Sequence, residues 1–263
     1  MTAGLGRPLE AALLGLPRLG VFLAFSPFLG GNVLNSQIKA AVLMALYCFV
    51  HPIVLGQTPA GALFGRPLGA ALGLLLKESF LGFILAYVSG LVFWAIQSAG
   101  FLMDNQRGAS SASASDPLSG EETSPLGSFL FQFLVYIFLA SHALTAFLAL
   151  FFETYLFWPP AAWRPDLLSP DLALFIAGLA AQLMTQMCLL AAPVVLAALL
   201  VDVSLGLINR FASQLNVYVL AMPIKSGLAM FIVLMLLSRL ADTAPGLFTG
   251  LTGDILHLKK IWP

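Results

Sequence analysis

Two adjacent ionisable residues, Lys77 and Glu78, lie inside a long apolar run and are the first candidates for chemistry in this sequence. A charge within an apolar segment is costly to bury and needs a partner, so such residues mark either structural ion pairs or paths for ions. Adjacent residues of a helix point about 100° apart, which predicts that Lys77 and Glu78 meet different neighbours rather than each other. We interpret them as structural charges, with a water-lined path as the alternative.

Catalytic and metal-binding patterns are the next possibility. The histidines, His51, His142 and His257, do not fall at the spacings of metal ligands. The sequence contains no HExxH, P-loop, GxSxG or dinucleotide-binding pattern, and no spacing of serine and histidine points to a nucleophile with its base. Cys48 and Cys188 lie in apolar runs, where a thiol usually acts as a small buried hydrophobe. The sequence therefore predicts no enzyme, no cofactor and no metal site.

A polar segment, Asp104–Ser124, separates two of the longest apolar runs. Its first half consists almost wholly of small residues from Gly108 to Ser115, which offer little apolar surface to offset the entropy of ordering the backbone. Its second half, DPLSGEETSPLG, combines Pro and Gly with carboxylates and predicts a system of turns. The segment is either a solvated loop or a movable gate.

A second polar concentration, Asp202–Ser226, follows the fifth apolar run. Several of its polar residues recur at spacings of three and four, so a helix would carry them on one broad face. That face would be either solvated or a buried hydrogen-bonding seam against partner subunits. The candidate seam residues are Asp202, Asn209, Arg210, Gln214, Asn216 and Lys225.

The overall composition indicates the class of protein and the kind of secondary structure in which these residues lie. Of the 263 residues, 60% are hydrophobic and 9% are charged, with 12 basic and 12 acidic side chains. This composition excludes an ordinary soluble domain, a disordered chain and an electrostatic nucleic-acid binder, and it indicates an integral membrane or membrane-complex protein. The length suits one helical unit over residues 1–263. The predicted fold class is all-α, with about six long, partly broken hydrophobic helices.

The predicted helices are too long for a simple membrane span. At about 1.5 Å per residue the third apolar run would be about 54 Å long, against about 30 Å of hydrocarbon in a bilayer. Such helices must tilt, break, or stand in an assembly that supplies further apolar surroundings. The apolar runs cover roughly 9–29, 38–55, 68–103, 128–158, 172–201 and 224–240, followed by a C-terminal tail over 241–263.

Prolines and aromatic residues suggest where these helices break or end. Pro52 and Pro193 lie inside apolar runs and are the candidate break points, because each removes a backbone hydrogen bond. Pro223 is expected to start the last apolar run. Glu153 lies near the end of the fourth run beside Tyr155 and Trp158, an arrangement typical of an anchor at the membrane interface.

Two longer motifs indicate a family. The stretches GFLMDNQRGASSASASDPLSGEETSPLG, residues 100–127, and GLINRFASQLNVYVLAMPIKS, residues 206–226, closely resemble the SctT/FliR family, the export-gate membrane component of type III secretion systems. The DPLSGEETSPLG form resembles the virulence, or injectisome, branch rather than the flagellar branch. The hydropathy profile and length match over essentially the whole chain. Ser213 departs from the family, which often has proline at this position.

The resemblance implies a non-catalytic subunit that assembles with SctR-like and SctS-like subunits, and with SctU-like and SctV-like components, into a protein-conducting export gate. The gate would lie in the bacterial inner membrane, within the secretion-system base and raised towards the periplasm, which would account for the overlong helices. Its substrates would be unfolded secreted polypeptides, and membrane lipid would be a further partner. The polar segment would lie in the pore as a plug, whose residues are Gln106, Arg107, Gly108, Ser110, Ser111, Ser113, Ser115, Asp116, Pro117, Glu121, Glu122, Ser124 and Pro125.

Two other classes of function are the alternatives. A small-solute or ion-coupled secondary transporter would use broken helices and the charges of Lys77 and Glu78, and internal inverted repeats, which we do not find, would support it. An intramembrane protease would require catalytic motifs that the sequence lacks. Co-purification with several different small membrane subunits would distinguish the export-gate subunit from both.

Overall fold

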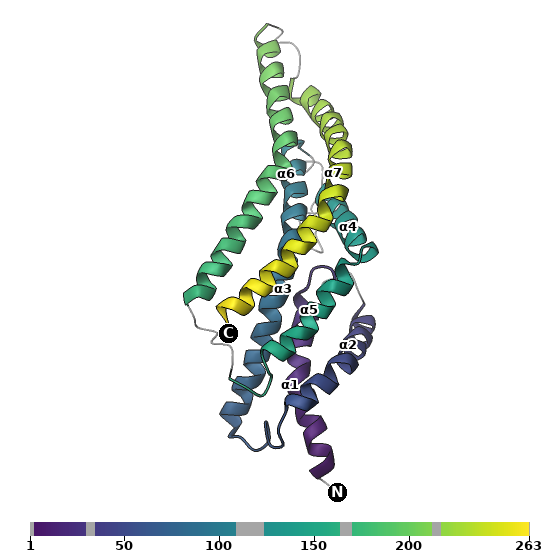
Figure 1. Ribbon diagram of the computed structural model, residues 1–263. Coiled ribbons are helices and arrows are strands. Elements are labelled where there is room, and N and C mark those ends of the chain that lie inside the picture. Colours follow the sequence, from purple (N-terminus) through teal and green to yellow (C-terminus); the bar gives the residue numbers. More distant parts are fainter. Residues whose placement is uncertain (1–2, 30–34, 109–123, 164–169, 212–216, 263) are drawn as a thin grey trace. The chain divides into compact units, whose positions relative to one another are not determined.

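The computed structural model describes residues 3–29, 35–108, 124–163, 170–211 and 217–262. Within these ranges the chain forms seven α-helices and no strand (Figure 1). The all-α prediction is therefore confirmed. In chain order the helices are α1 (Ala3–Phe25), α2 (Ser36–Gln57), α3 (Leu68–Gln106), α4 (Pro125–Ala140), α5 (Ala143–Phe157), α6 (Pro170–Phe211) and α7 (Val217–Ile261).

The chain divides into two compact units. The first unit contains residues 1–91, 142–179 and 248–263, and the second contains residues 92–141 and 180–247. Helices α3, α6 and α7 each begin in one unit and end in the other. The buried charges predicted near Lys77 therefore belong to the first unit, and both ends of the polar segment belong to the second.

The helices match the predicted number of membrane spans. Within the described residues, α1, α2, α3, α6 and α7 are each long and apolar enough to cross a membrane. Helices α4 and α5 together form a sixth candidate span, with a bend of 76° between them. The prediction of about six hydrophobic helices, some of them broken, is confirmed.

The position of the break differs from the prediction. The fourth apolar run, expected as one helix, forms two helices. Helix α4 ends at Ala140, with Ser141 as its C-cap, and α5 begins at Ala143, with His142 as its N-cap. The Ser141 hydroxyl donates to the Phe138 carbonyl oxygen at 3.2 Å, which satisfies one of the carbonyl groups that a helix end leaves open. The breaks expected at Pro52 and Pro193 are wrong, because α2 and α6 continue through them. A helix can accommodate an internal proline by bending at the lost hydrogen bond.

The last helix also differs from the prediction. Pro223 lies inside α7 rather than at its start, and Pro245 follows it within the same helix. The residues expected as a C-terminal tail, 241–263, continue α7 as far as Ile261. Beyond Leu240 the buried apolar residues recur at spacings of three and four, which gives the helix one apolar face for packing: Ala244, Phe248, Leu251, Ile255 and Leu258.

An aromatic cluster joins α1 to α5 in the first unit. The ring centroid of Phe22 lies 4.5 Å from that of Phe151 and 5.6 Å from that of Phe147, and all three side chains are buried. Gly82 of α3 lies so close to the Arg18 backbone that a Cβ would clash with it. Arg18 lies one helical turn before Phe22 and therefore on the same face of α1. This packing thus fixes the direction in which the Arg18 side chain points.

In the second unit, α3 and α4 meet backbone to backbone at two glycines. A Cβ added to Gly100 would lie 2.5 Å from the Gly127 Cα atom and 2.6 Å from its nitrogen. A Cβ added to Gly127 would lie 2.8 Å from the Gln97 carbonyl oxygen. Only glycine allows such an approach, so these residues fix where the polar segment leaves α3 and enters α4.

Replacing Gly100 with alanine is expected to destabilise the second unit by about 1–3 kcal/mol, because the new Cβ must displace the Gly127 backbone. The measurement is the thermal unfolding midpoint of the purified protein with whatever subunits copurify. Gly178→Ala is the matched control, because nothing lies within 4 Å of its added Cβ. Equal midpoints for the two variants would show that α3 and α4 do not meet at Gly100.

Candidate functional site

Lys77 and Glu78 belong to a cluster of buried charges in the first unit. Their side chains are 3% and 0% exposed, and Lys77 Nζ lies 2.7 Å from Glu78 Oε1. The prediction that the two side chains do not meet is wrong, because the flexible lysine stem brings its ammonium group back to the adjacent carboxylate. Glu78 Oε1 nevertheless makes no hydrogen bond within the described residues, so the Lys77 N–H groups point to other acceptors.

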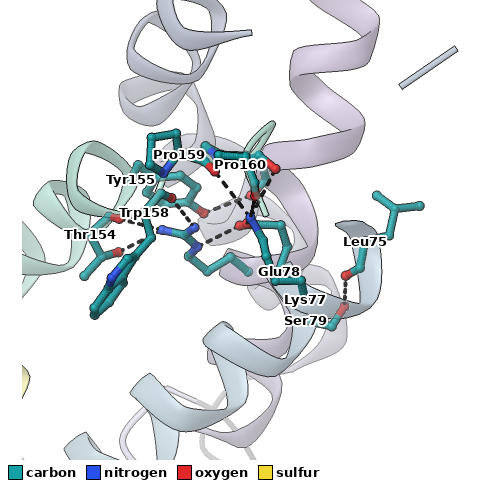
Figure 2. Close-up of polar contacts among 12 residues, drawn as sticks. Leu75, Lys77, Glu78, Ser79, Thr154, Tyr155, Trp158, Pro159 and Pro160 are labelled. Atoms are coloured by element: carbon teal, nitrogen blue, oxygen red, sulfur yellow. Dashed lines mark hydrogen bonds and ion pairs between the residues drawn. The ribbon is translucent and has the colours of Figure 1, made fainter. Parts of the chain in front are cut away.

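The centre of the cluster is Arg18, a fully buried residue of α1. Its Nε donates to Glu78 Oε2 at 2.8 Å, its Nη1 to the Thr154 carbonyl oxygen at 2.8 Å, and its Nη2 to the Trp158 carbonyl oxygen at 2.7 Å. Figure 2 shows Thr154 and Trp158 on one side of the cluster and Glu78 on the other. The guanidinium group also lies 4.3 Å from the centroid of the Tyr155 ring. One arginine thus links α1, α3 and the end of α5.

Cationic side chains also bind the chain directly after α5. Five consecutive carbonyl groups, those of residues 158–162, accept hydrogen bonds from them. Lys77 Nζ donates to three of these groups at 2.7 to 3.3 Å, Arg66 Nη2 to a fourth at 3.1 Å, and Arg18 to the fifth. The segment begins Trp-Pro-Pro, and proline has no N–H for a regular ladder of backbone hydrogen bonds. Hydrogen bonds from the side chains of Arg18, Arg66 and Lys77 therefore satisfy these carbonyl groups in place of backbone N–H groups.

These contacts favour the structural interpretation of Lys77 over the ion path. A lysine ammonium group has three N–H donors, and the carbonyl oxygens of Pro159, Pro160 and Ala162 match that number. A proton carrier needs a donor or acceptor that is open to exchange, whereas this side chain is almost completely buried and fully engaged.

Sequence reasoning missed Arg18 and misjudged two aromatic residues. The available signal was an arginine inside the first apolar run, since such a residue must find a partner when it is buried. Tyr155 and Trp158 are fully buried within the unit, whereas Glu153 is exposed, so the two aromatic residues do not take part in the predicted interfacial anchor. The Tyr155 hydroxyl donates to the Gly15 carbonyl oxygen at 2.9 Å.

The end of α7 packs beside the same cluster. The Trp158 indole Nε1 donates to the Trp262 carbonyl oxygen at 3.0 Å, and the two rings lie 5.8 Å apart. The Lys259 ammonium group lies 3.6 Å from the centroid of the Phe157 ring. The C-terminal residues are therefore docked on the first unit.

The structure describes the two ends of the predicted plug. Gln106 is the last residue of α3, Arg107 and Gly108 form the following turn, and Ser124 and Pro125 are the N-cap and first residue of α4. Gly108 has a φ of 78°, the left-handed conformation that commonly ends a helix. Ser110, Ser111, Ser113, Ser115, Asp116, Pro117, Glu121 and Glu122 lie outside the described residues.

Asp104, predicted as the first residue of the polar segment, lies within α3 and is buried. Its Oδ1 is 2.7 Å from Arg107 Nε, and its Oδ2 accepts hydrogen bonds from Ser124 Oγ at 2.6 Å and from the Leu126 N–H at 2.9 Å. One carboxylate thus contacts both ends of the segment.

The structure brings two of the predicted seam residues together. Lys225 of α7 and Asp202 of α6 form an ion pair with an N–O distance of 2.5 Å. Asn209 and Arg210 are exposed in the chain, and Gln214 and Asn216 lie outside the described residues.

A cavity of about 530 Å³ lies between these residues and the start of the predicted plug. It is lined by Gln106 and Arg107 at the end of α3, by Asp202 of α6, and by Met222 and Lys225 of α7. The two polar motifs, about a hundred positions apart in the sequence, therefore share one site.

The described residues contain no group of three or more His, Cys, Asp or Glu side chains that could hold a metal ion. Cys48 and Cys188 are exposed and form no disulfide. The candidate site is thus made of ion pairs and backbone contacts.

Comparison with known proteins identifies the family. Residues 9–251 match the family described as bacterial export proteins, family 1. The chain is 37% identical over 224 residues to Yop proteins translocation protein T of Yersinia pestis, covering 85% of this chain and 84% of that protein. It is 33% identical to the secretion system apparatus protein SsaT and 32% identical to the surface presentation of antigens protein SpaR, both of Salmonella typhimurium, each over 87% of this chain and 83% of the relative.

The match covers almost all of α1 to α7, including the two motifs from which the family was predicted. The apolar helices agree with a protein embedded in a membrane. The chain therefore belongs to the SctT/FliR family of type III export apparatus proteins.

Proposed function

We propose that this protein is a non-catalytic subunit of the injectisome export gate, which forms a protein-conducting channel with SctR-like and SctS-like subunits. The gate would stand in the bacterial inner membrane, raised towards the periplasm, and would receive unfolded polypeptides in cooperation with SctU-like and SctV-like components. The segment 104–124 would act as the plug of the channel.

The observation that carries this proposal is the large apolar surface of α6 and α7. These helices have 42 and 45 residues, and only 22% and 17% of their most apolar windows are buried within the chain. At about 1.5 Å per residue each is more than 60 Å long, about twice the hydrocarbon thickness of a bilayer. Lipid can cover only part of such a surface, so the rest requires protein neighbours. Several apolar partner subunits would meet this need.

Co-expression with SctR-like and SctS-like subunits from the same secretion system tests the proposal. We expect an affinity-tagged chain to copurify with both, and native mass measurement to give a hetero-oligomer. The chain expressed alone should aggregate or be degraded, because its folded form depends on binding partners. An isolated chain that is monomeric, monodisperse and active in solute transport in lipid would instead support the transporter alternative.

Arg210→Ala is expected to reduce assembly. Arg210 is exposed in the chain alone, and in the proposed assembly it forms part of a buried polar seam. Removing it would leave a partner carboxylate or carbonyl unpaired, at a cost of about 2–5 kcal/mol. The yield of copurified partner subunits measures the effect. Arg239→Ala, at an exposed arginine of α7 outside the motif, is the control. Normal yield with Arg210→Ala would assign this face to solvent.

A further inference from the structure

The segment between α3 and α4 begins and ends at one buried carboxylate. Asp104 is 3% exposed, and its Oδ2 is 2.6 Å from Ser124 Oγ, although the two residues are 20 positions apart. The same oxygen accepts the Leu126 N–H, 22 positions away. The other oxygen, Oδ1, is 2.7 Å from both Nε and Nη2 of Arg107.

This arrangement requires an aspartate. Four donor groups converge on two oxygens, and an ionised carboxylate is a side chain that only accepts hydrogen bonds. Asparagine has the same shape but replaces one oxygen with an NH₂ group, which would face donors. Hydrogen bonds to a charged acceptor are also roughly twice as strong as neutral ones.

Ser124 connects the carboxylate to the start of α4. Its hydroxyl donates to Asp104 and at the same time accepts the Gly127 N–H at 2.9 Å, as the N-cap of the helix. Together with the Leu126 contact, this satisfies two of the N–H groups that a helix start leaves open. One turn before Asp104, Gly100 holds α3 against Gly127. The two ends are thus joined at two levels, by backbone packing and by the carboxylate.

We propose that Asp104 is a positioning residue for the plug: with Arg107 and Ser124 it ties together the two ends of the segment that α3 and α4 deliver to the channel. This inference rests on the proposed plug function. Loss of the tie leaves the Gly100–Gly127 packing in place but frees the last turn of α3 from the first turn of α4, and with them the ends of the segment.

The distance between the two ends tests the tie directly. Spin labels are placed on Asn105→Cys and Ser128→Cys, two exposed positions on either side of the tie, in a background where Cys48 and Cys188 are replaced with serine. In the assembled complex we expect a narrow distance distribution, and a clearly broader one with Asp104→Asn. Asp242→Asn, an exposed acid of α7 in the same unit, should leave the distribution unchanged. Ser124→Ala, which removes one of the four donors, should give an intermediate width and serves if Asp104→Asn does not accumulate.

Conductance of the reconstituted complex separates this inference from the plug function. We expect Asp104→Asn to raise conductance several-fold at unchanged complex yield, towards that of a complex lacking residues 108–115. In one outcome the deletion complex leaks while the Asp104→Asn complex keeps the parent's low conductance and its narrow distance distribution. That combination would overturn the inference and leave the plug function intact. A broad distribution with no leak in either complex would retain the tie and overturn the plug function.

Discussion

Arg18→Met will strongly reduce the amount of protein that accumulates in the membrane, by at least about tenfold. The substitution keeps an unbranched apolar stem but removes the donors that satisfy Glu78 and the carbonyl groups of Thr154 and Trp158. Removing one partner of a buried ion pair costs about 3–5 kcal/mol, a large share of the about 5–15 kcal/mol that stabilises a typical fold. Protein abundance in membranes and the unfolding midpoint of the purified complex are the measurements.

Two further variants make this prediction specific to the ion pair. Arg239→Met changes an exposed arginine and should leave abundance unchanged. Arg18→Met combined with Glu78→Gln should lose less stability than the sum of the single variants, because each single change already breaks the contact between these two side chains. Additive losses would show that Arg18 and Glu78 do not act as a pair. Normal accumulation of Arg18→Met would show that Arg18 does not hold the first unit together.

Deleting residues 108–115 will leave assembly intact and make the membrane permeable to ions. The deleted residues are mostly small and contribute little apolar surface, so few contacts with partners are lost. The 17 residues between Gln106, the end of α3, and Ser124, the N-cap of α4, can reach about 28 Å out and back at roughly 3.3 Å per residue, which is enough to obstruct a pore. Shortening it removes the obstruction. Conductance of reconstituted complexes with and without the deletion is the measurement.

The control for the deletion keeps the length of the segment. Replacing Ser110, Ser111, Ser113 and Ser115 with alanine preserves the volume that fills the lumen and should preserve the seal. A deletion complex that assembles and is as tight as the parent would assign the seal to apolar side chains of partner subunits. A leak in both variants would show that the hydroxyl groups, rather than the filled volume, are required.

The residues alone predict the class of fold, the family and the approximate spans, because these depend on local properties. Hydropathy is summed over one helix at a time, and the two motifs around Asp104–Ser124 and Asp202–Ser226 are contiguous in the chain. The ends of the polar segment can also be predicted from local residues. Pro125 at the first position of α4 and Gly108 after the end of α3 are local signals of where a helix starts and stops.

The contacts across long sequence separations could not be predicted in this way. Arg18 meets Glu78 at a separation of 60 positions and Trp158 at a separation of 140, and no periodicity in the sequence links these residues. The pairing of Lys77 depends on where the chain after α5 returns, and the tie at Asp104 depends on the close approach of Gly100 and Gly127. Local patterns report which charges are buried. Their partners are set by the way the helices pack, because a buried charge takes whichever donors and acceptors that packing brings within reach.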